Sequence, residues 1–402
     1  MVDAGLFVGG VVVTLFAGIL NGSWNICVKP DAPALVRAVE PEGEKEGWNY
    51  DHAWMSMMSS AIPVNLAICF AFIKPSSLFD IVASSTTSDL ALICVFSFLW
   101  GLGTYGFGLS IQIAGLGMGT TLNMGVIVVV GTFLPLLLDV QSKLNTASGY
   151  TIIGGLMICT FSFLAAAKAL ALKDSDEASL TPPPTPPLPS TDLEDPTSAS
   201  TIELNVVTTA TKPPPPSSLP PSPSEHSTFT KVTVCVVSGI LCTMLQFSFV
   251  FSEDMRNIAE TRYSVPSALS SAVTFFFAIT ICPIPNVVIP LIKLKRNGKL
   301  HYLRSSPHST SNYLKTLFLM ALPWVVQSHL YGISAASLLG PDYGAAVGWP
   351  LLIVTTNVTG LVIGWKFLGE WDLAKPETIM YIKFSLALSV LGLGIVSIGG
   401  LL

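Results

Sequence analysis

The chain has 402 residues, of which 50% are hydrophobic and only 11% are charged. The mean hydropathy of +0.63 is too high for a soluble globular protein of this length. The net charge of −5 is spread along the chain, and outside one linker no basic or acidic tail indicates a nucleic-acid or anionic partner. The composition therefore predicts a protein embedded in a lipid bilayer, without a nucleic-acid partner.

Ten apolar runs are each long enough to cross the hydrocarbon core as a helix, which takes about 20 residues. In chain order they are 6–28, 53–73, 88–112, 118–139, 150–172, 230–251, 265–291, 313–335, 344–364 and 378–401. The first run follows MVDA, which lacks the positive segment and the cleavage site of a secretory signal, so we expect a retained transmembrane helix. The predicted fold class is an all-α membrane protein with ten transmembrane helices.

A proline-rich segment divides these runs into two groups of five. Between Asp174 and Thr228 lie 14 of the 29 prolines, a composition that can neither bury a core nor lie in lipid. We therefore predict a first five-helix repeat over 1–172, a disordered cytosolic linker over 173–229 and a second five-helix repeat over 230–402. A passive tether and a segment regulated by phosphorylation of its Ser-Pro and Thr-Pro steps are both open for this linker.

The two groups of runs share short patterns. AGIL (17–20) recurs as SGIL (238–241), and Gly115 to Gly119 before the fourth run matches Gly340 to Gly344 before the ninth. An odd number of helices in each half makes the repeat inverted, as in carriers that work by alternating access. The side that holds the linker carries 16 of the 20 Lys and Arg residues. The positive-inside rule therefore places the linker in the cytosol and both termini outside it.

The eighth run contains polar residues in the stretch LPWVVQSHLYG. Trp324, Gln327 and Tyr331 are spaced i, i+3, i+7 and form one stripe of a helix. A buried amide without partners is costly in hydrocarbon, so we expect Gln327 to face the bundle interior or water. Between two aromatic rings this amide fits a sugar-binding platform. A hydrogen bond that joins two helices is an equal alternative.

The first run ends in GILNGSWNICVKP, where Asn21, Trp24 and Asn25 share one face. Two amides beside an indole repeat the chemistry of the eighth run, as a site between two repeats requires. The other amides that we consider within the runs are Asn123, Gln246 and Asn357. Six amides distributed over five runs predict a polar cavity inside the bundle.

His329 is the only histidine within the ten runs. An ionisable group inside a membrane is a functional hypothesis by default, but His329 lies about 140° around the helix from Trp324. Proton relay and structural bonding to a neighbouring helix are both open for it. The seven cysteines occur singly, and no metal-binding or catalytic motif is present. We therefore predict no enzyme activity, no cofactor and no metal.

Three groups of motifs carry a family resemblance. They are LWGLGTYGFGLSIQIAGLGMGTTLNMGVIVVVGT (99–132); Trp324, Gln327 and Tyr331 followed by Pro341, Trp349 and Glu370-Trp371; and NGSWNICVK (21–29) with Trp48 and Trp54. In order and spacing they resemble the L-rhamnose–proton symporter family of the drug/metabolite transporter superfamily, over all ten runs. Ala345 stands where that family has an aspartate, and Asp342 follows Pro341 instead.

The resemblance implies a secondary active transporter that moves a neutral deoxy-sugar or polyol together with a proton, in the plasma membrane or an endomembrane. The expected substrate-binding residues are Asn21, Trp24, Asn25, Asn123, Trp324, Gln327, Tyr331 and Asn357, with His329 as the candidate for proton coupling. A metabolite or nucleotide-sugar exchanger of the same superfamily is an alternative, but it needs midplane Lys or Arg to bind phosphate, and none is predicted. A non-transporting membrane scaffold is the other alternative.

Overall fold

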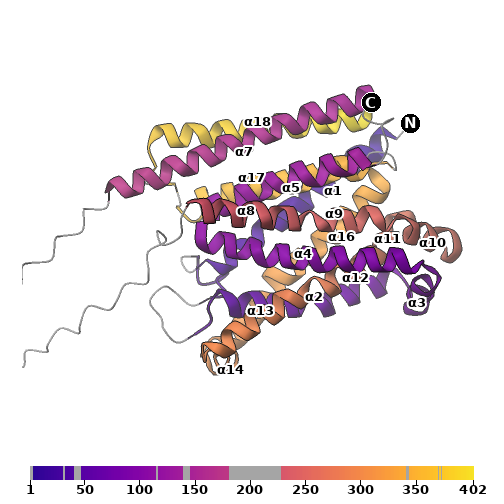
Figure 1. Cartoon of the computed structure of the whole chain (residues 1–402), viewed down its shortest axis with the longest axis horizontal. Coiled ribbons are helices and arrows are strands. Elements are labelled where there is room, and N and C mark those ends of the chain that lie inside the picture. Colours follow the sequence, from indigo (N-terminus) through magenta and orange to yellow (C-terminus); the bar gives the residue numbers. More distant parts are fainter. Residues whose placement is uncertain are drawn as a thin grey trace, which may run out of the picture.

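The computed structural model describes residues 3–29, 32–39, 47–114, 116–138, 145–180, 228–340, 344–369, 371–372 and 374–402. In these residues all the regular secondary structure is helical (Figure 1). Pro341, Asp342 and Glu370 of the family motifs lie outside the described residues, as does the linker from residue 181 to residue 227. The predicted all-α fold class is confirmed for the described part of the chain.

Nine segments of the described chain are long and apolar enough to cross a membrane. They are built from α1 (Ala4–Ser23) with η1 (Trp24–Val28); α2 (Tyr50–Phe72); α4 (Thr87–Ala114); α7 (Ala147–Leu180); α8 (Thr228–Cys242) with α9 (Met244–Phe251) and α10 (Glu253–Tyr263); α11 (Ser267–Ser270) with α12 (Ala272–Ile281) and α13 (Pro283–Arg296); α15 (Ser309–Lys315) with η3 (Thr316–Ala321), α16 (Leu322–Ile333) and η4 (Ser334–Leu338); α17 (Gly344–Lys366); and α18 (Pro376–Leu401).

The fourth predicted span corresponds to α5 (Leu116–Leu138), of which the shorter apolar stretch Gly119–Phe133 is described in full. The multi-pass prediction is thus confirmed for nine of the ten runs. Two short helices, α3 (Pro75–Ser84) and α14 (Tyr302–Ser305), complete the fold, and α10 extends the sixth run beyond its predicted end. The fifth span runs further than predicted, because α7 continues as helix to Leu180.

Local sequence signals explain where several of these helices begin. Asp3 caps α1 by accepting a hydrogen bond from the Gly5 backbone N–H at 2.7 Å. Asn49 and His52 form a reciprocal capping box at the start of α2. At α3, α13 and α18, a proline occupies the first turn, where its missing N–H costs nothing.

Four of the long runs are not continuous α-helices, and the first of them ends in the 3-10 helix η1. The sixth run breaks at Thr243, and the seventh breaks at Ser271 and again at Cys282, directly before Pro283. At Cys282 the break follows from Pro283, because proline cannot donate the helical hydrogen bond. At Thr243 the side-chain hydroxyl donates to the Ile240 carbonyl at 2.6 Å, and this bond competes with the regular helical hydrogen bonds. In the eighth run, the π-helical turns η3 and η4 flank α16. Such turns are frequent at functional sites.

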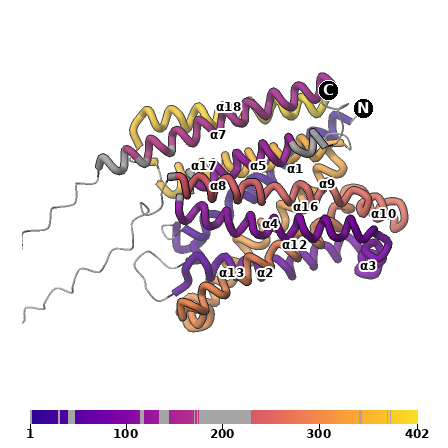
Figure 2. Tube along the Cα trace, viewed as in Figure 1, coloured from indigo at the N-terminus to yellow at the C-terminus, as the bar shows by residue number. Residues whose placement is uncertain are grey.

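The helices pack as a bundle, and α7 and α18 form one edge of it. Figures 1 and 2 show α7 and α18 side by side along their lengths at one edge of the molecule, where they make the most extensive helix contact. In the rest of the bundle, α1 packs on α17, α4 packs on α8, and α2 packs on α12 and α13. Both chain ends lie at the same end of the molecule (Figure 1).

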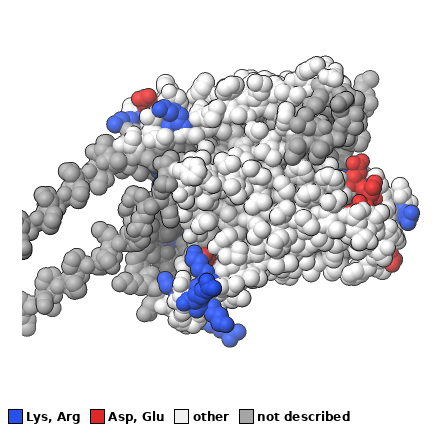
Figure 3. Space-filling view, in the orientation of Figure 1, with Lys and Arg blue, Asp and Glu red and all other residues white. Residues whose placement is uncertain are grey.

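Charged side chains gather at the two ends of the bundle. Lys293, Lys295 and Arg296 lie in the last turn of α13, and Glu253 and Asp254 lie in the first turn of α10 at the opposite end (Figure 3). Among the described residues drawn in that view, the surface between the two ends is almost free of charge. This distribution is the one expected of a protein whose middle lies in hydrocarbon.

The basic end is held together by contacts between α2 and the segment from α13 to α14. Lys293 forms an ion pair with buried Asp51 at 2.9 Å. The Trp48 indole N–H donates to the Tyr302 carbonyl at 3.0 Å, and His52 Nε2 lies 3.0 Å from the Lys299 carbonyl oxygen. These contacts join the two predicted halves of the chain at this end.

Small residues allow α7 and α18 to approach closely. A Cβ placed on Gly392 would lie 3.0 Å from the backbone N of Cys159 and from the backbone O of Gly155. Ser162 of α7 bonds to Ser389 of α18 at 2.6 Å. A Cβ on Gly394 would meet nothing within 4 Å. Close packing through a small residue therefore applies to Gly392 and not to Gly394.

This difference gives a matched test of the interface. We expect Gly392→Leu to lower the free energy of unfolding by about 1–3 kcal/mol, because the added side chain must separate two backbones in contact. Gly394→Leu should leave it unchanged within about 0.5 kcal/mol. The midpoint of thermal unfolding in detergent measures both, and equal midpoints for the two variants would contradict the packing described here.

Candidate functional site: a tryptophan-lined cavity

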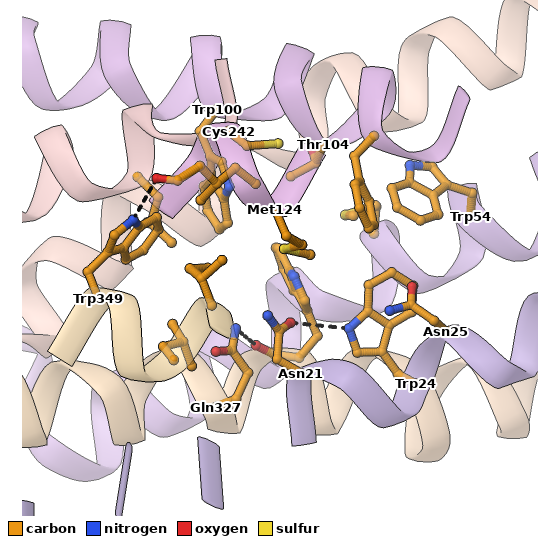
Figure 4. Close-up of a pocket in the computed structure, with 17 residues that line it drawn as sticks. Asn21, Trp24, Asn25, Trp54, Trp100, Thr104, Met124, Cys242, Gln327 and Trp349 are labelled. Carbon is orange, nitrogen blue, oxygen red and sulfur yellow. Dashed lines mark hydrogen bonds between the residues drawn. The ribbon is translucent and has the colours of Figure 1, made fainter. Parts of the chain in front are cut away.

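A cavity lies in the middle of the bundle, between helices from both predicted halves. Counted with its opening, the space among its lining residues is about 610 Å³. The lining residues are Asn21, Trp24, Asn25, Trp54, Met58, Trp100, Thr104, Phe107, Met124, Ile127, Cys242, Leu245, Trp324, Gln327, Trp349, Leu352 and Ile353 (Figure 4). No charged residue lines it in the described part of the chain.

Five tryptophans form most of the aromatic wall. Trp24 and Trp54 lie at one end of the cavity and Trp349 at the opposite end (Figure 4). The ring centroids of Trp24 and Trp54 are 5.7 Å apart, and Trp100 stacks on Trp324 at 5.3 Å with an interplanar angle of 17°. These flat apolar faces suit C–H groups of a small ligand.

The indole N–H groups differ in whether the protein satisfies them. Trp24 donates to Asn21 Oδ1 at 3.3 Å, and Trp349 donates to the Ile127 carbonyl at 3.2 Å (Figure 4). The N–H groups of Trp100 and Trp324 make no hydrogen bond to a described residue. Two indole donors on the cavity wall are therefore left for a ligand.

Two amide oxygens on the wall are buried without a partner. They are Oδ1 of Asn25 and Oε1 of Gln327. The Gln327 amide nitrogen donates to the Trp324 carbonyl at 3.0 Å and to Ser328 Oγ at 2.8 Å, which orients its oxygen elsewhere. A buried acceptor without a donor costs about 1–3 kcal/mol. Both oxygens would gain from a ligand that supplies O–H groups.

The local backbone geometry helps to present these side chains. Asn25 lies in η1, where the chain tightens from α-helix to a 3-10 helix. Trp324 and Gln327 lie in α16, between the two wide π-helical turns. Asn21 is held by a hydrogen bond from its Nδ2 to Thr356 Oγ1 of α17 at 3.1 Å. The irregular segments thus coincide with the polar part of the cavity wall.

Five of the eight predicted substrate-binding residues line this cavity, and they are Asn21, Trp24, Asn25, Trp324 and Gln327. The other three lie elsewhere. The Asn123 amide donates to the Cys235 carbonyl at 3.3 Å and to Ser238, between α5 and α8. The Tyr331 hydroxyl donates to Gln246, and its ring packs behind Trp349. Asn357 lines a smaller adjoining cavity.

His329 faces away from the cavity toward α2. Its Nε2 lies 3.0 Å from Asn65 Oδ1, and the Asn65 amide nitrogen donates to the Phe275 carbonyl at 2.9 Å. Rings of Phe72 and Phe275 pack on the imidazole at 5.7 and 5.2 Å. These contacts link α16 to α2 and α12, as the structural alternative requires, and the imidazole Nδ1 has no partner among the described residues.

Asn286 is a site-supporting residue that sequence reasoning missed. Its amide nitrogen lies 2.8 Å from each of the Gly101 carbonyl, Thr104 Oγ1 and the Cys282 carbonyl. Its oxygen accepts the Trp54 indole N–H at 2.8 Å. Asn286 thus fixes Trp54 and Thr104, both on the cavity wall. The sequence offered one signal for this residue, because Asn286 lies three residues after Pro283, where the seventh run breaks.

The charged residues of α10 do not line the cavity. Arg256 of α10 bonds to the Phe249 carbonyl and to Ser252 Oγ, the latter at 2.7 Å. Its guanidinium lies 4.3 Å from the Phe249 ring centroid.

In the described residues no group of three His, Cys, Asp or Glu lies close enough to hold a metal ion. The cavity can therefore bind through aromatic faces, amides and indole donors.

Comparison of the chain with known protein families, with curated proteins and with solved structures finds no match. The fold and the cavity define the class as a multi-pass helical membrane protein.

Asn286 provides a test of how the cavity wall is supported. Asn286→Leu removes the acceptor of Trp54 and should destabilise the protein by about 1–3 kcal/mol, because a buried indole N–H loses its partner. It should also shift the tryptophan fluorescence maximum. Asn297→Leu is the control, because Asn297 is exposed at the end of α13. An unchanged thermal midpoint in Asn286→Leu would refute the supporting role.

Proposed function

We propose that the chain is a secondary active transporter of a small neutral polyhydroxylated molecule, such as a deoxy-sugar or polyol. The observation that carries this proposal is the uncharged cavity with two unpaired amide oxygens among five tryptophans. The motif resemblance to the L-rhamnose–proton symporter family points to the same substrate class and to a proton as the coupling ion.

The chemistry of the wall matches such a ligand group by group. Hydroxyl hydrogens of the ligand can bond to Asn25 Oδ1 and Gln327 Oε1, and hydroxyl oxygens can accept from the N–H groups of Trp100 and Trp324. Apolar C–H faces, which a deoxy-sugar has in addition, pack on the indoles. A nucleotide sugar would need a cation for its phosphates, and in the described chain none lines the cavity.

The packing of the helices supports an inverted repeat and alternating access. Numbering the predicted spans in order, the contact of the first with the ninth (α1, α17) has its counterpart in the sixth with the fourth (α8, α5). The third with the sixth (α4, α8) corresponds to the eighth with the first (α16, α1). Three spans also pack on their own counterparts in the other half. The second packs on the seventh (α2 on α12 and α13), the fourth on the ninth (α5 on α17) and the fifth on the tenth (α7 on α18). A two-fold relation between the halves explains all these pairs.

We further propose that the basic end faces the cytosol, because positively charged residues favour that side. Both termini then lie on the other side. Proton coupling rests on the family resemblance, and His329 is its candidate residue. The contacts of His329 with Asn65 place it outside the cavity wall, so coupling through it would act on the packing of α2 against α16.

Counterflow in proteoliposomes tests the transport proposal, with L-rhamnose, L-fucose and mannitol as probes. We expect exchange of at least one probe by the wild type, and its loss in Gln327→Leu with the protein still in the membrane. Gln112→Leu is the control, because Gln112 is exposed and does not line the cavity. Uptake by Gln327→Leu at normal apparent affinity would remove Gln327 from the site, and a scaffold would exchange none of the probes.

Proton coupling gives a separate expectation. An imposed proton gradient should drive accumulation of the transported sugar, and a protonophore should abolish accumulation while leaving counterflow intact, because exchange needs no net driving force. Accumulation that persists with the protonophore would indicate a different coupling ion, and a failure to accumulate under any gradient would indicate a uniporter.

A further inference from the structure

A second, smaller cavity adjoins the tryptophan-lined one. Counted with its openings, the space among its lining residues is about 350 Å³, and it lies between α1, α5 and α17. The two cavities share Asn25 and Met124 as lining residues. We propose that the smaller cavity, once it is joined to the central one, is a second binding position for the same substrate, occupied between the central cavity and the basic end of the protein. This inference rests on the proposed transport function.

The smaller cavity has unsatisfied polar atoms of both kinds. Asn357 is 3% exposed, and its Nδ2 has no hydrogen-bond partner. Its Oδ1 accepts a hydrogen bond from Thr121 at 3.4 Å, so the nitrogen remains as a free donor. On the opposite wall, Asn25 is 6% exposed and its Oδ1 is a free acceptor. A hydroxyl group, which both donates and accepts, can satisfy the two amides together.

The shared wall is suited to open and close. Asn25 belongs to the short 3-10 segment η1 rather than to a regular helix. Met124 is buried between the cavities, and its unbranched side chain has three rotatable bonds that adapt to different shapes. A change of Met124 rotamer would connect the two spaces without moving a helix. Asn25 could then stay bonded to one substrate hydroxyl while the molecule passes.

The smaller cavity lies on the side of the central cavity that faces the basic end of the protein. A Cβ on Gly18 would lie 2.6 Å from Thr355 Cβ, and one on Gly22 would lie 2.6 Å from Thr359 Cβ. Residue numbers on α1 and α17 therefore rise together, and the two helices run parallel. They end at Lys29 and Lys366. The smaller cavity uses the last part of both helices, so it lies between the central cavity and this basic end.

Gly360 keeps the smaller cavity open. The sequence pairs Gly360 with Gly364 at GxxxG spacing, which predicts close helix packing. A Cβ on Gly360 would meet nothing within 4 Å, so the missing side chain provides space instead. Gly22 on the opposite wall behaves differently, because its Cβ would lie 2.6 Å from the Thr356 carbonyl oxygen. Filling the space at Gly360 should therefore obstruct the cavity without separating helices.

The test is Gly360→Val in the full-length chain, with Gly154→Val as the matched control. Both glycines are partly buried in helices and have nothing within 4 Å of an added Cβ, but Gly154 lines neither cavity. We use whichever of L-rhamnose, L-fucose and mannitol the wild type exchanges fastest. Gly360→Val should keep the sugar-dependent rise in thermal midpoint and lose at least about tenfold in counterflow rate. Gly154→Val should keep both.

A second variant covers the case in which valine is not accommodated at position 360. Asn357→Leu removes the free donor, and we expect it too to bind sugar as the wild type does and to exchange it at least about tenfold more slowly. Wild-type counterflow in folded Gly360→Val, or in Asn357→Leu, overturns the second position. Loss of sugar-dependent stabilisation in either variant also overturns it, because the two cavities would then be one site. Absence of counterflow in the wild type instead overturns the transport function itself.

Discussion

The structure depends on one constraint, which is that hydrocarbon offers no hydrogen-bond partner to a polar group. Most buried polar side chains obey it completely. Both ends of the Asn286 amide are hydrogen-bonded, the nitrogen to Gly101, Thr104 and Cys282 and the oxygen to Trp54. Ten buried side-chain atoms of the described residues have no hydrogen-bond partner. Three of them belong to residues that line the two cavities, and they are Oδ1 of Asn25, Oε1 of Gln327 and Nδ2 of Asn357. A ligand in the cavities could supply the hydrogen bonds that these three atoms lack.

Helix irregularity and cavity position are connected by the same constraint. The breaks at Thr243 and Cys282 and the two π-helical turns beside α16 interrupt the regular ladder, and each freed backbone group needs a partner inside the bundle. Asn286 supplies one at the Cys282 carbonyl. The α7–α18 pair, in contrast, is regular and tightly packed through Gly392 and Ser162. The cavity is lined by the irregular segments around Asn25, Cys242 and Gln327 together with the regular helices α2, α4, α5 and α17, and the α7–α18 pair lies at the edge of the bundle.

Among the described residues, no charged side chain lines either cavity. Such a lining fits a neutral substrate. Charged residues gather instead at the two ends of the bundle. If the protein transports as proposed, a hydroxylated molecule would exchange one amide for the next, from Gln327 to Asn25 to Asn357, without crossing a charged layer. Amides bind a phosphate less well than a cation does, so the proposed path would favour neutral molecules over anionic ones.

The sequence by itself determined the bilayer environment, nine of the membrane-crossing segments and the faces that carry Trp324 with Gln327 and Asn21 with Asn25. Apolar length and helical periodicity depend only on neighbours along the chain, so they can be read from it. Only the tertiary structure decided that Trp100 and Trp349 join the cavity, that Asn123, Tyr331 and His329 bond elsewhere, and that Gly360 makes room rather than contact. Periodicity says which side chains share a face, but the partner of each depends on which distant helix packs there.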